Sequence, residues 1–225
     1  AGKSSRFRPS TPEMGKLAAA TPVILPTSDQ TEFKVTPAQL RAAITPRTRL
    51  FILNSPSNPT GSVYTPEEVK ALGDVCLERG VLIMSDEIYE QLTFGTRKPT
   101  CVATLRAGLK DRTITISGAS KSYAMTGWRM GWAIAPAPLV KAMDTIQSQE
   151  TSCPSSVSQA ALVAALTGPQ ECVAEMRAEF AASRELPLGQ LTAIRGVKLP
   201  VAEGACYAFF AGSADFGKTC ADQSV

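Results

Sequence analysis

The sequence predicts an α/β protein with a mostly parallel β-sheet covered by helices. Two short apolar runs, residues 50–53 and 81–84, flank a segment with helical periodicity at 66–79. A strand, a helix and a second strand in succession are typical of a parallel sheet with crossover helices. Both runs are continuously apolar rather than alternating, which predicts strands buried on both faces. With 44% hydrophobic residues in 225, the chain can bury a sizeable core.

The helix at 66–79 is predicted from its ends as well as from its periodicity. Thr65 and Glu68 form a capping box, and Pro66 occupies the first helical position. Apolar residues then recur on one face until Gly80, a residue that commonly ends helices. This segment therefore connects the first two predicted strands.

Further elements follow from the same kind of pattern. We expect strands over 113–116 and 130–134, and helices over 137–149, 155–167 and 170–194. Pro187 falls inside the last of these helices, where a proline costs about 3 kcal/mol or kinks the helix. We therefore expect a bend near Leu186.

Polar residues follow three of the predicted strands. Asn54, Asp86 and Ser117 each lie at or just past the end of a strand. In open α/β sheets, ligands gather at the carboxyl ends of the strands. The sequence thus predicts one site, built from three strand ends.

Composition excludes several classes of function. A net charge of +3 without long basic runs gives no nucleic-acid footprint, and no apolar stretch reaches the length of a membrane span, so we expect neither partner and a soluble protein. The chain has no histidine, which excludes a histidine-containing zinc site and a Ser-His triad, and we expect no metal. Six cysteines without a CxxC pair predict reduced, mostly core thiols. The basic N-terminus lacks the apolar region of a secretory signal, so a cytoplasmic location is expected by default, with an Arg/Ser-rich remnant of a transit peptide as the alternative.

Lys121 lies in the run from Ser117 to Arg129, among small and hydroxyl residues. A neutral lysine amine forms a Schiff base with an aldehyde, and an arginine eight positions later suits a phosphate. This pattern points to an aldehyde cofactor that carries a phosphate.

Three segments in order strengthen this interpretation: Asn54 to Gly61, Ser85 to Tyr89, and Ser117 to Arg129. Together they resemble the class I aminotransferases of pyridoxal phosphate (PLP) fold type I, and among these the aspartate aminotransferase-like branch. The resemblance runs from about Pro12 to about Lys218, and Glu203 to Phe209 also looks like a family segment.

The resemblance implies a domain organisation. Residues 1–169 would form the PLP-binding large domain, incomplete at its N-terminus, and residues 170–225 the interdomain helix and the truncated start of a small C-terminal domain. A chain of this extent would lack the family's phosphate-binding helix end, its stacking aromatic residue and its arginine for the substrate carboxylate. We therefore expect a poor aminotransferase in isolation, with strands that face water where an N-terminal part would cover them.

The resemblance also assigns the catalytic groups. Lys121 would form the Schiff base with pyridoxal 5'-phosphate and move the substrate proton. Asp86 would pair with the pyridine nitrogen and keep the ring cationic, and therefore an effective electron sink. Without the resemblance, Asp86 would be explained as a cap of the turn after a strand.

Two further residues would contact the ring hydroxyl of the cofactor. Tyr89 would donate from one side and Asn58 from the other, and both would lower the pKa of the Schiff base. The resemblance further implies a cis peptide bond before Pro59. Taken alone, Asn58 is explained equally well as part of an Asn-Pro turn.

The phosphate would be held by Arg129 and Ser120. A planar guanidinium makes a two-point, charge-assisted contact with phosphate, although a surface arginine in a turn is the simpler explanation for Arg129 alone. Gly118 stands where many relatives have another hydroxyl, and Ser117 is a candidate substitute.

The function that the resemblance implies is transamination between an amino acid, expected to be aspartate, and a 2-keto acid, expected to be 2-oxoglutarate. In its full-length form the family is homodimeric. Two alternatives stay open: another PLP enzyme of the same fold, such as a lyase or an aminocyclopropane-carboxylate synthase, and a non-catalytic fragment that serves as an interaction surface.

Overall fold

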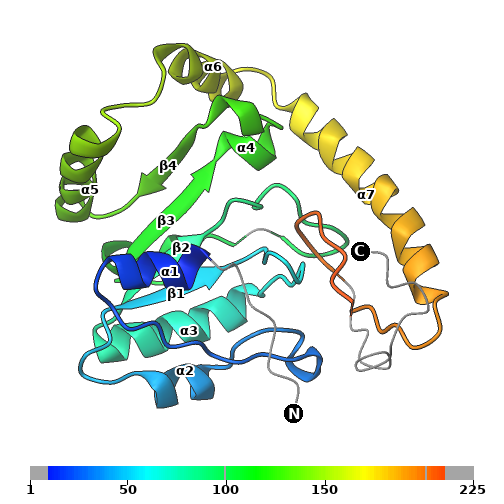
Figure 1. Ribbon diagram of the computed structural model, residues 1–225, viewed down its shortest axis with the longest axis horizontal. Helices are drawn as coiled ribbons and strands as arrows, with labels where there is room; N and C mark the ends of the chain where they lie inside the picture. The colour runs from blue at the N-terminus through cyan, green and yellow to red at the C-terminus, as the bar shows by residue number, and fades with distance from the viewer. Residues whose placement is uncertain (1–9, 99, 201, 211–225) are drawn as a thin grey trace, which may run out of the picture.

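The computed structural model describes residues 10–98, 100–200 and 202–210. A four-stranded sheet has the order β1 (Leu50–Asn54), β2 (Leu82–Asp86), β3 (Thr113–Gly118) and β4 (Gly131–Ile134). The first three strands are parallel and β4 is antiparallel to β3. Figure 1 shows this sheet with helices around it, so the predicted α/β class and all four strands are confirmed.

The strand register brings the predicted polar positions to one edge of the sheet. Asn54 is aligned with Asp86, and Asp86 with Ile116, one residue before Ser117. Because the three strands are parallel, their carboxyl ends and the loops that follow lie at the same edge. This confirms the prediction of three neighbouring strand ends.

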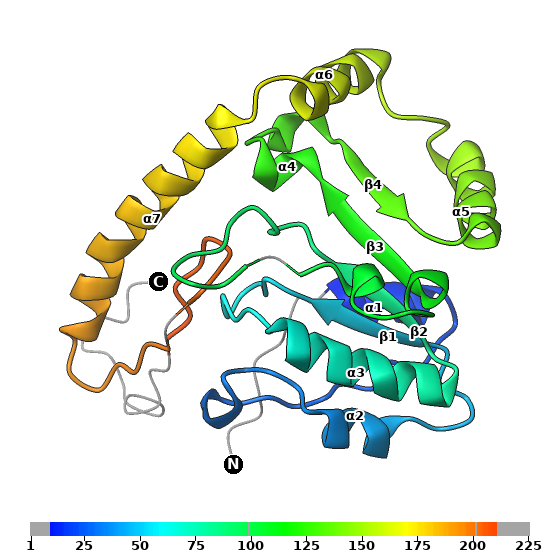
Figure 2. The same ribbon diagram turned by 180° about the vertical axis from the view of Figure 1, so that it is seen from behind.

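Helix α3 (Pro66–Arg79) has the predicted bounds and the predicted cap. The Thr65 hydroxyl accepts the Glu68 backbone N–H at 3.2 Å, and the Glu68 carboxylate accepts the Thr65 N–H at 2.7 Å. Gly80 ends the helix with a φ of 67°. In Figure 2, α3 and α2 (Pro37–Ala43) lie next to each other below the strands. The buried core consists of side chains from α3, from one face of the sheet and from the segments that connect them, together with Leu40 of α2.

The two faces of the sheet differ in burial, which corrects the prediction of strands buried on both faces. Leu53 and Ile83 belong to the core under α3. Their neighbours point to the other face, where Leu50 and Ile52 remain 36% and 40% exposed. Burial along the strands therefore alternates, because α3 covers only one face in the part of the chain that the structure describes. The expectation that strands face water is confirmed on this second face.

The later helices match the predicted ranges within two residues. They are α5 (Ala137–Glu150), α6 (Ser156–Thr167) and α7 (Glu171–Thr192). Helix α7 continues through Pro187, so the proline does not end it, and the bend near Leu186 stays a prediction. The elements not predicted are short: α1 (Ser10–Leu17), α2 (Pro37–Ala43), α4 (Ala119–Ser122), η1 (Asp29–Thr31), η2 (Val102–Thr104), η3 (Lys110–Arg112) and η4 (Thr126–Trp128).

The segment after α7 returns to the sheet edge. The orange-red stretch in Figure 1 runs back from the end of α7 towards the loops that follow the strands. The backbone N–H groups of Glu203 and Gly204 both donate to the Gly61 carbonyl at 2.9 Å. The Ala205 N–H donates to the Leu92 carbonyl at 2.9 Å, and a bridge pairs Thr93 with Gly204. Backbone hydrogen bonds thus attach residues 203–205 to two of the strand-end loops. The predicted division of the chain at residue 170 stays a prediction.

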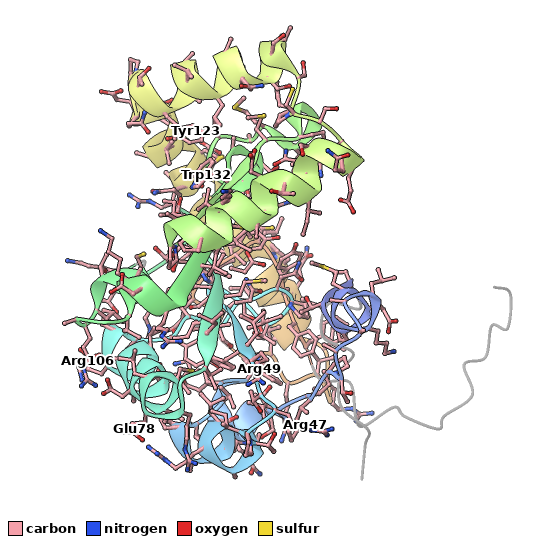
Figure 3. The ribbon with its side chains drawn as sticks, turned by 90° about the vertical axis from the view of Figure 1, so that its left-hand side faces the viewer. Arg47, Arg49, Glu78, Arg106, Tyr123 and Trp132 are labelled. Carbon is pink, nitrogen blue, oxygen red and sulfur yellow. The ribbon has the colours of Figure 1, made fainter. Side chains whose placement is uncertain are left out.

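Charged side chains cluster on the outer side of α3. Asp74 pairs with Lys70 at 3.0 Å and with Arg106, and Glu78 pairs with Arg41. Figure 3 shows Glu78 and Arg106 at this outer surface. Such exposed pairs contribute at most about 1 kcal/mol each to stability.

The cysteines are less buried than the sequence predicts. The described cysteines are free, but only Cys76 is buried, Cys101 is partly buried, and Cys153, Cys172 and Cys206 are exposed, so the prediction of mostly core thiols is wrong.

Among the described helices, none is both long enough and apolar enough to span a bilayer.

Candidate functional site

The loop after β1 carries Asn58 and is held to the end of β2. The Asn54 side-chain amide donates to the Asp86 carbonyl at 3.0 Å, and its oxygen accepts the Asn58 backbone N–H at 2.9 Å. The Asn58–Pro59 peptide bond is cis, as predicted, and Ser55–Pro56 is cis as well. Asn54 therefore links the ends of β1 and β2 and holds the backbone of Asn58 in place.

Asp86 is the last residue of β2, and the loop that follows carries Tyr89. The Asp86 carboxylate accepts the Ile88 backbone N–H at 3.3 Å, which is the turn cap expected of an aspartate at a strand end. Asp86 is partly buried, and only 1% of Tyr89 is exposed. Tyr89 packs with Leu92 and Ala205 in a small apolar cluster apart from the main core.

Asn58 and Tyr89 converge on a third residue, Tyr207. The Asn58 side-chain amide donates to the Tyr207 hydroxyl at 3.0 Å. The hydroxyl oxygens of Tyr89 and Tyr207 lie 2.5 Å apart, and the two rings meet edge to face with centroids 5.8 Å apart. Two of the predicted ligand donors thus lie at one point, together with a residue to which the sequence assigned no role.

Lys121 lies on the short helix α4, directly after β3. Its amine is 5.7 Å from the centre of the Tyr89 ring, so a third predicted residue lies beside the same tyrosine. The turn that follows is tied back to the helix, because the Tyr123 and Met125 N–H groups both donate to the Ala119 carbonyl. The lysine side chain is partly buried.

The predicted phosphate ligands are less tightly assembled. Ser120 is partly buried on α4, whereas Arg129 is exposed and donates to the Thr126 carbonyl at 2.9 Å. A guanidinium carries five N–H groups, so this hydrogen bond leaves donors for another acceptor. The Ser117 hydroxyl donates to the Glu90 carboxylate at 3.2 Å, which argues against Ser117 as a phosphate ligand.

The structure also explains why Gly118 carries no hydroxyl. A Cβ atom at this position would lie 2.9 Å from the Met130 carbonyl oxygen and 3.0 Å from the Gly131 Cα. Both are backbone atoms at the start of β4, where strand pairing holds them in place. A serine or threonine would therefore force β3 and β4 apart.

Two acidic side chains next to Asp86 and Tyr89 in the sequence, Glu87 and Glu90, were not assigned a role from the sequence. Glu87 is buried and accepts hydrogen bonds from the Ser85 hydroxyl at 2.8 Å and from the Val102 N–H at 3.2 Å. Burial raises the pKa of the Glu87 carboxyl above its usual value, and burial likewise raises the pKa of Glu90. These two acids resist ionisation more than ordinary glutamates do.

Of the predicted residues, the structure thus brings Asn58, Tyr89 and Lys121 together, and places Asp86 at the adjoining strand end. Ser120 directly precedes Lys121 on α4, whereas Arg129 hydrogen-bonds within its own turn. The residue that sequence reasoning missed is Tyr207. Its signal was present, since a phenol lies in a segment already singled out, Glu203 to Phe209, but only the fold shows what it contacts.

This donor set fits an aldehyde cofactor with an acidic ring hydroxyl. An amide and a phenol converge to donate, an amine lies beside them, and a carboxylate lies at the adjoining strand end. Such groups can bind an aldehyde covalently and stabilise negative charge on a neighbouring oxygen.

Comparison with known proteins agrees with this geometry. The family model described as "Aminotransferase class I and II" matches residues 9–223. The chain is 50% identical over 198 residues to an aspartate aminotransferase of Geobacillus stearothermophilus, covering 88% of this chain and 50% of that protein. It is 49% identical over 211 residues to an aspartate/prephenate aminotransferase of Cereibacter sphaeroides, covering 93% of this chain and 53% of that protein.

Solved structures give the same result. The crystal structure of the aspartate aminotransferase from Rhizobium meliloti superposes with a TM-score of 0.89 at 42% identity, covering 92% of this chain and 52% of that chain. The aspartate aminotransferase from Thermus thermophilus with maleate superposes with a TM-score of 0.83 at 38% identity, covering 88% and 52%. The chain therefore spans about half the length of the relatives it matches.

Proposed function

Because this chain belongs to the aminotransferase class I and II family, we propose that it carries the cofactor-binding part of a pyridoxal phosphate-dependent aminotransferase. The observation that supports this most is the convergence of Asn58, Tyr89 and Lys121 from three separate strand-end loops. Parallel pairing explains why the three segments are neighbours, whereas the contacts among their amide, phenol and amine are those that an aldehyde cofactor with a ring hydroxyl requires. The named relatives, at 49–50% identity, support the same activity.

In this proposal each residue has a defined role. When bound, pyridoxal 5'-phosphate supplies an aldehyde for an amine and a ring that accepts electrons from the carbon next to it. Lys121 holds the aldehyde and later carries the substrate proton on its amine. Asp86 holds a proton on the ring nitrogen, Tyr89 and Asn58 donate to the ring oxygen, and Ser120 and Arg129 bind the phosphate.

The substrates that we propose are an amino acid, aspartate in the first place, and a 2-keto acid such as 2-oxoglutarate. The name of the Cereibacter sphaeroides relative adds prephenate as a second candidate amino acceptor. A homodimer, a cytoplasmic location and the absence of nucleic-acid and membrane partners belong to the same proposal. Turnover of aspartate with each acceptor, compared with the Geobacillus stearothermophilus relative under the same conditions, tests the substrate assignment.

The binding step is tested by covalent trapping. The chain is incubated with pyridoxal 5'-phosphate, reduced with borohydride, digested and mapped by mass spectrometry. We expect the pyridoxyl group on Lys121, and we expect Lys121→Arg to abolish labelling while Lys141→Arg, which changes an exposed lysine on α5, leaves it intact. Labelling of another lysine with Lys121 unmodified would contradict the assignment.

Covalent trapping and the turnover measurement together separate the alternatives. A folded chain that takes up no cofactor would favour a non-catalytic protein that acts as an interaction surface. A lyase or an aminocyclopropane-carboxylate synthase would label Lys121 equally, but it would release no keto acid from aspartate in exchange for 2-oxoglutarate.

A further inference from the structure

Tyr207 comes from a distant part of the chain and lies between the two residues assigned to the ring oxygen of the cofactor. It is 149 residues after Asn58 and 118 residues after Tyr89, and its hydroxyl contacts both at 3.0 Å and 2.5 Å. It belongs to the segment that follows α7, outside the three strand-end loops.

The position of Tyr207 is fixed by the backbone. Residues 203–205 form the hydrogen bonds to the Gly61 and Leu92 carbonyls described above, and the Phe94 N–H donates to the Glu203 carbonyl at 2.8 Å. The Glu203 carboxylate also pairs with Arg97 at 2.7 Å. Ala205, two residues before Tyr207, is 1% exposed and packs on Tyr89. The contact of the three side chains is therefore built into the fold and does not depend on one mobile side chain.

The count of protons shows what the hydroxyl of Tyr207 can do. An asparagine amide has two N–H groups, so donating one to Tyr207 leaves the other for a ligand. A phenol has one proton and can accept as well as donate. If Tyr207 donates to Tyr89, then Tyr89 accepts that bond and keeps its own proton as a donor. Both residues are then oriented by Tyr207 without losing their capacity to bind an oxygen of the cofactor.

Accepting a hydrogen bond from Tyr207 would also make the Tyr89 hydroxyl a stronger hydrogen-bond donor. A hydroxyl that accepts a hydrogen bond becomes a better hydrogen-bond donor, because the two bonds polarise each other. The short separation between Tyr89 and Tyr207 and the burial of Tyr89 make this coupling effective. The direction of the chain would be from Tyr207 to Tyr89 and from Tyr89 to the ring oxygen.

We propose that Tyr207 is a positioning residue of the cofactor site, which orients Asn58 and polarises Tyr89. This inference rests on the proposed function. Its consequence concerns the acid strength of the bound cofactor. Hydrogen bonds to the ring oxygen stabilise the deprotonated chromophore, so weakening them raises the pH at which the chromophore loses its proton.

The test is a pH titration of the absorbance of the chain loaded with pyridoxal 5'-phosphate. We expect Tyr207→Phe to raise the midpoint by about 0.5–1 pH unit, or about three- to tenfold in the dissociation constant. The matched control is Tyr123→Phe, which removes the same hydroxyl from a residue whose partner is Gln170 at 2.8 Å, and which should leave the midpoint unchanged. In a Tyr89→Phe background the effect of Tyr207→Phe should fall to about half or less, because one of its two targets is gone.

The outcomes separate the two proposals. A wild-type chain that gives no cofactor absorbance overturns both the proposed function and the role of Tyr207. A normal wild-type titration with an unshifted midpoint in Tyr207→Phe overturns the role of Tyr207 alone, as does a shift that is fully additive with Tyr89→Phe. Should Tyr207→Phe not fold, 3-fluorotyrosine at position 207 keeps the ring and makes the hydroxyl a stronger donor. It should lower the midpoint, and an unchanged or higher midpoint would refute the positioning role.

Discussion

The substitution Gly61→Ala should weaken the attachment of residues 203–205, because the Gly61 carbonyl accepts two of the hydrogen bonds that hold this segment. Gly61 has a φ of 70°, and a Cβ atom there would lie 2.5 Å from the Ala202 Cβ and 2.9 Å from the Gly204 carbonyl oxygen. Left-handed backbone costs a non-glycine residue roughly 1–2 kcal/mol, and overpacking against atoms that cannot move aside costs about 1–3 kcal/mol. We therefore expect Gly61→Ala to lower the free energy of unfolding by about 2–5 kcal/mol.

Gly80→Ala is the matched control for this prediction. Gly80 has nearly the same φ, 67°, but no heavy atom lies within 4 Å of the position its Cβ would take. Gly80→Ala should therefore cost only the backbone contribution, roughly 1–2 kcal/mol. Equilibrium urea unfolding, followed by circular dichroism, measures both variants. Equal losses would show that contact with residues 202–204 contributes nothing to stability, and would refute the attachment inferred from the Gly61 carbonyl.

Three further predictions concern buried or site groups. Because burial raises the pKa of Glu87 in the folded state, its contribution to stability is fully present below the usual value of 4.5 and is lost as the pH rises through the folded value. Glu87→Gln keeps both hydrogen bonds, so this variant should unfold at neutral pH no more easily than wild type. A variant whose stability shows the full wild-type pH dependence above 4.5 would contradict this prediction. Tyr64→Phe removes the hydroxyl that accepts the Val35 N–H at 2.7 Å, and should cost about 1–3 kcal/mol in urea unfolding, whereas a neutral result would mean that water satisfies this N–H. Asp86→Ala should retain cofactor through Lys121 but lose most of the exchange of the substrate α-proton with solvent deuterium, and exchange at the wild-type rate would assign control of the ring nitrogen to another group.

Local signals in the sequence predicted the four strands and the four longest helices well. The capping box at Thr65 and Glu68 and the glycine at position 80 fix both ends of α3 within the chain itself, so no distant contact was needed to place them. The strands were equally predictable, because short apolar runs next to a helix have few other structures available.

Burial on the second face of the sheet could not be predicted in this way. The apolar character of residues 50–53 shows that these side chains can be buried, but whether they are buried depends on which element covers them. In the described part of the chain, the α3 side is buried in the core and the second face is covered only in part, so Ile52 stays exposed. The same reasoning applies to the cysteines, because the residue type at position 153 or 172 does not determine which other side chains cover it.

The residues of the candidate site differ in the same way, because local sequence places some of them and distant contacts place Tyr207. Asn58, Asp86, Tyr89 and Lys121 follow strand ends, so parallel pairing brings their loops together as soon as the sheet forms. Tyr207 does not follow a strand end, and its place is set by hydrogen bonds to carbonyl groups of two loops. No periodicity in the sequence encodes a contact between residues separated by 149 positions.

This difference has a physical consequence for how the site can fail. The sheet and the α3 core share a large buried surface. Residues 203–205 are held by a few backbone hydrogen bonds, each contributing about 0.5–1.5 kcal/mol net, by one partly exposed ion pair, and by the packing of one small side chain, Ala205, on Tyr89. Local opening of a weakly held segment requires less free energy than global unfolding. A change such as Gly61→Ala should therefore first release Tyr207 from Asn58 and Tyr89, while the strand-end residues keep their positions. The acid strength of the bound cofactor would then change at a temperature or urea concentration where the circular dichroism of the sheet and helices is still native.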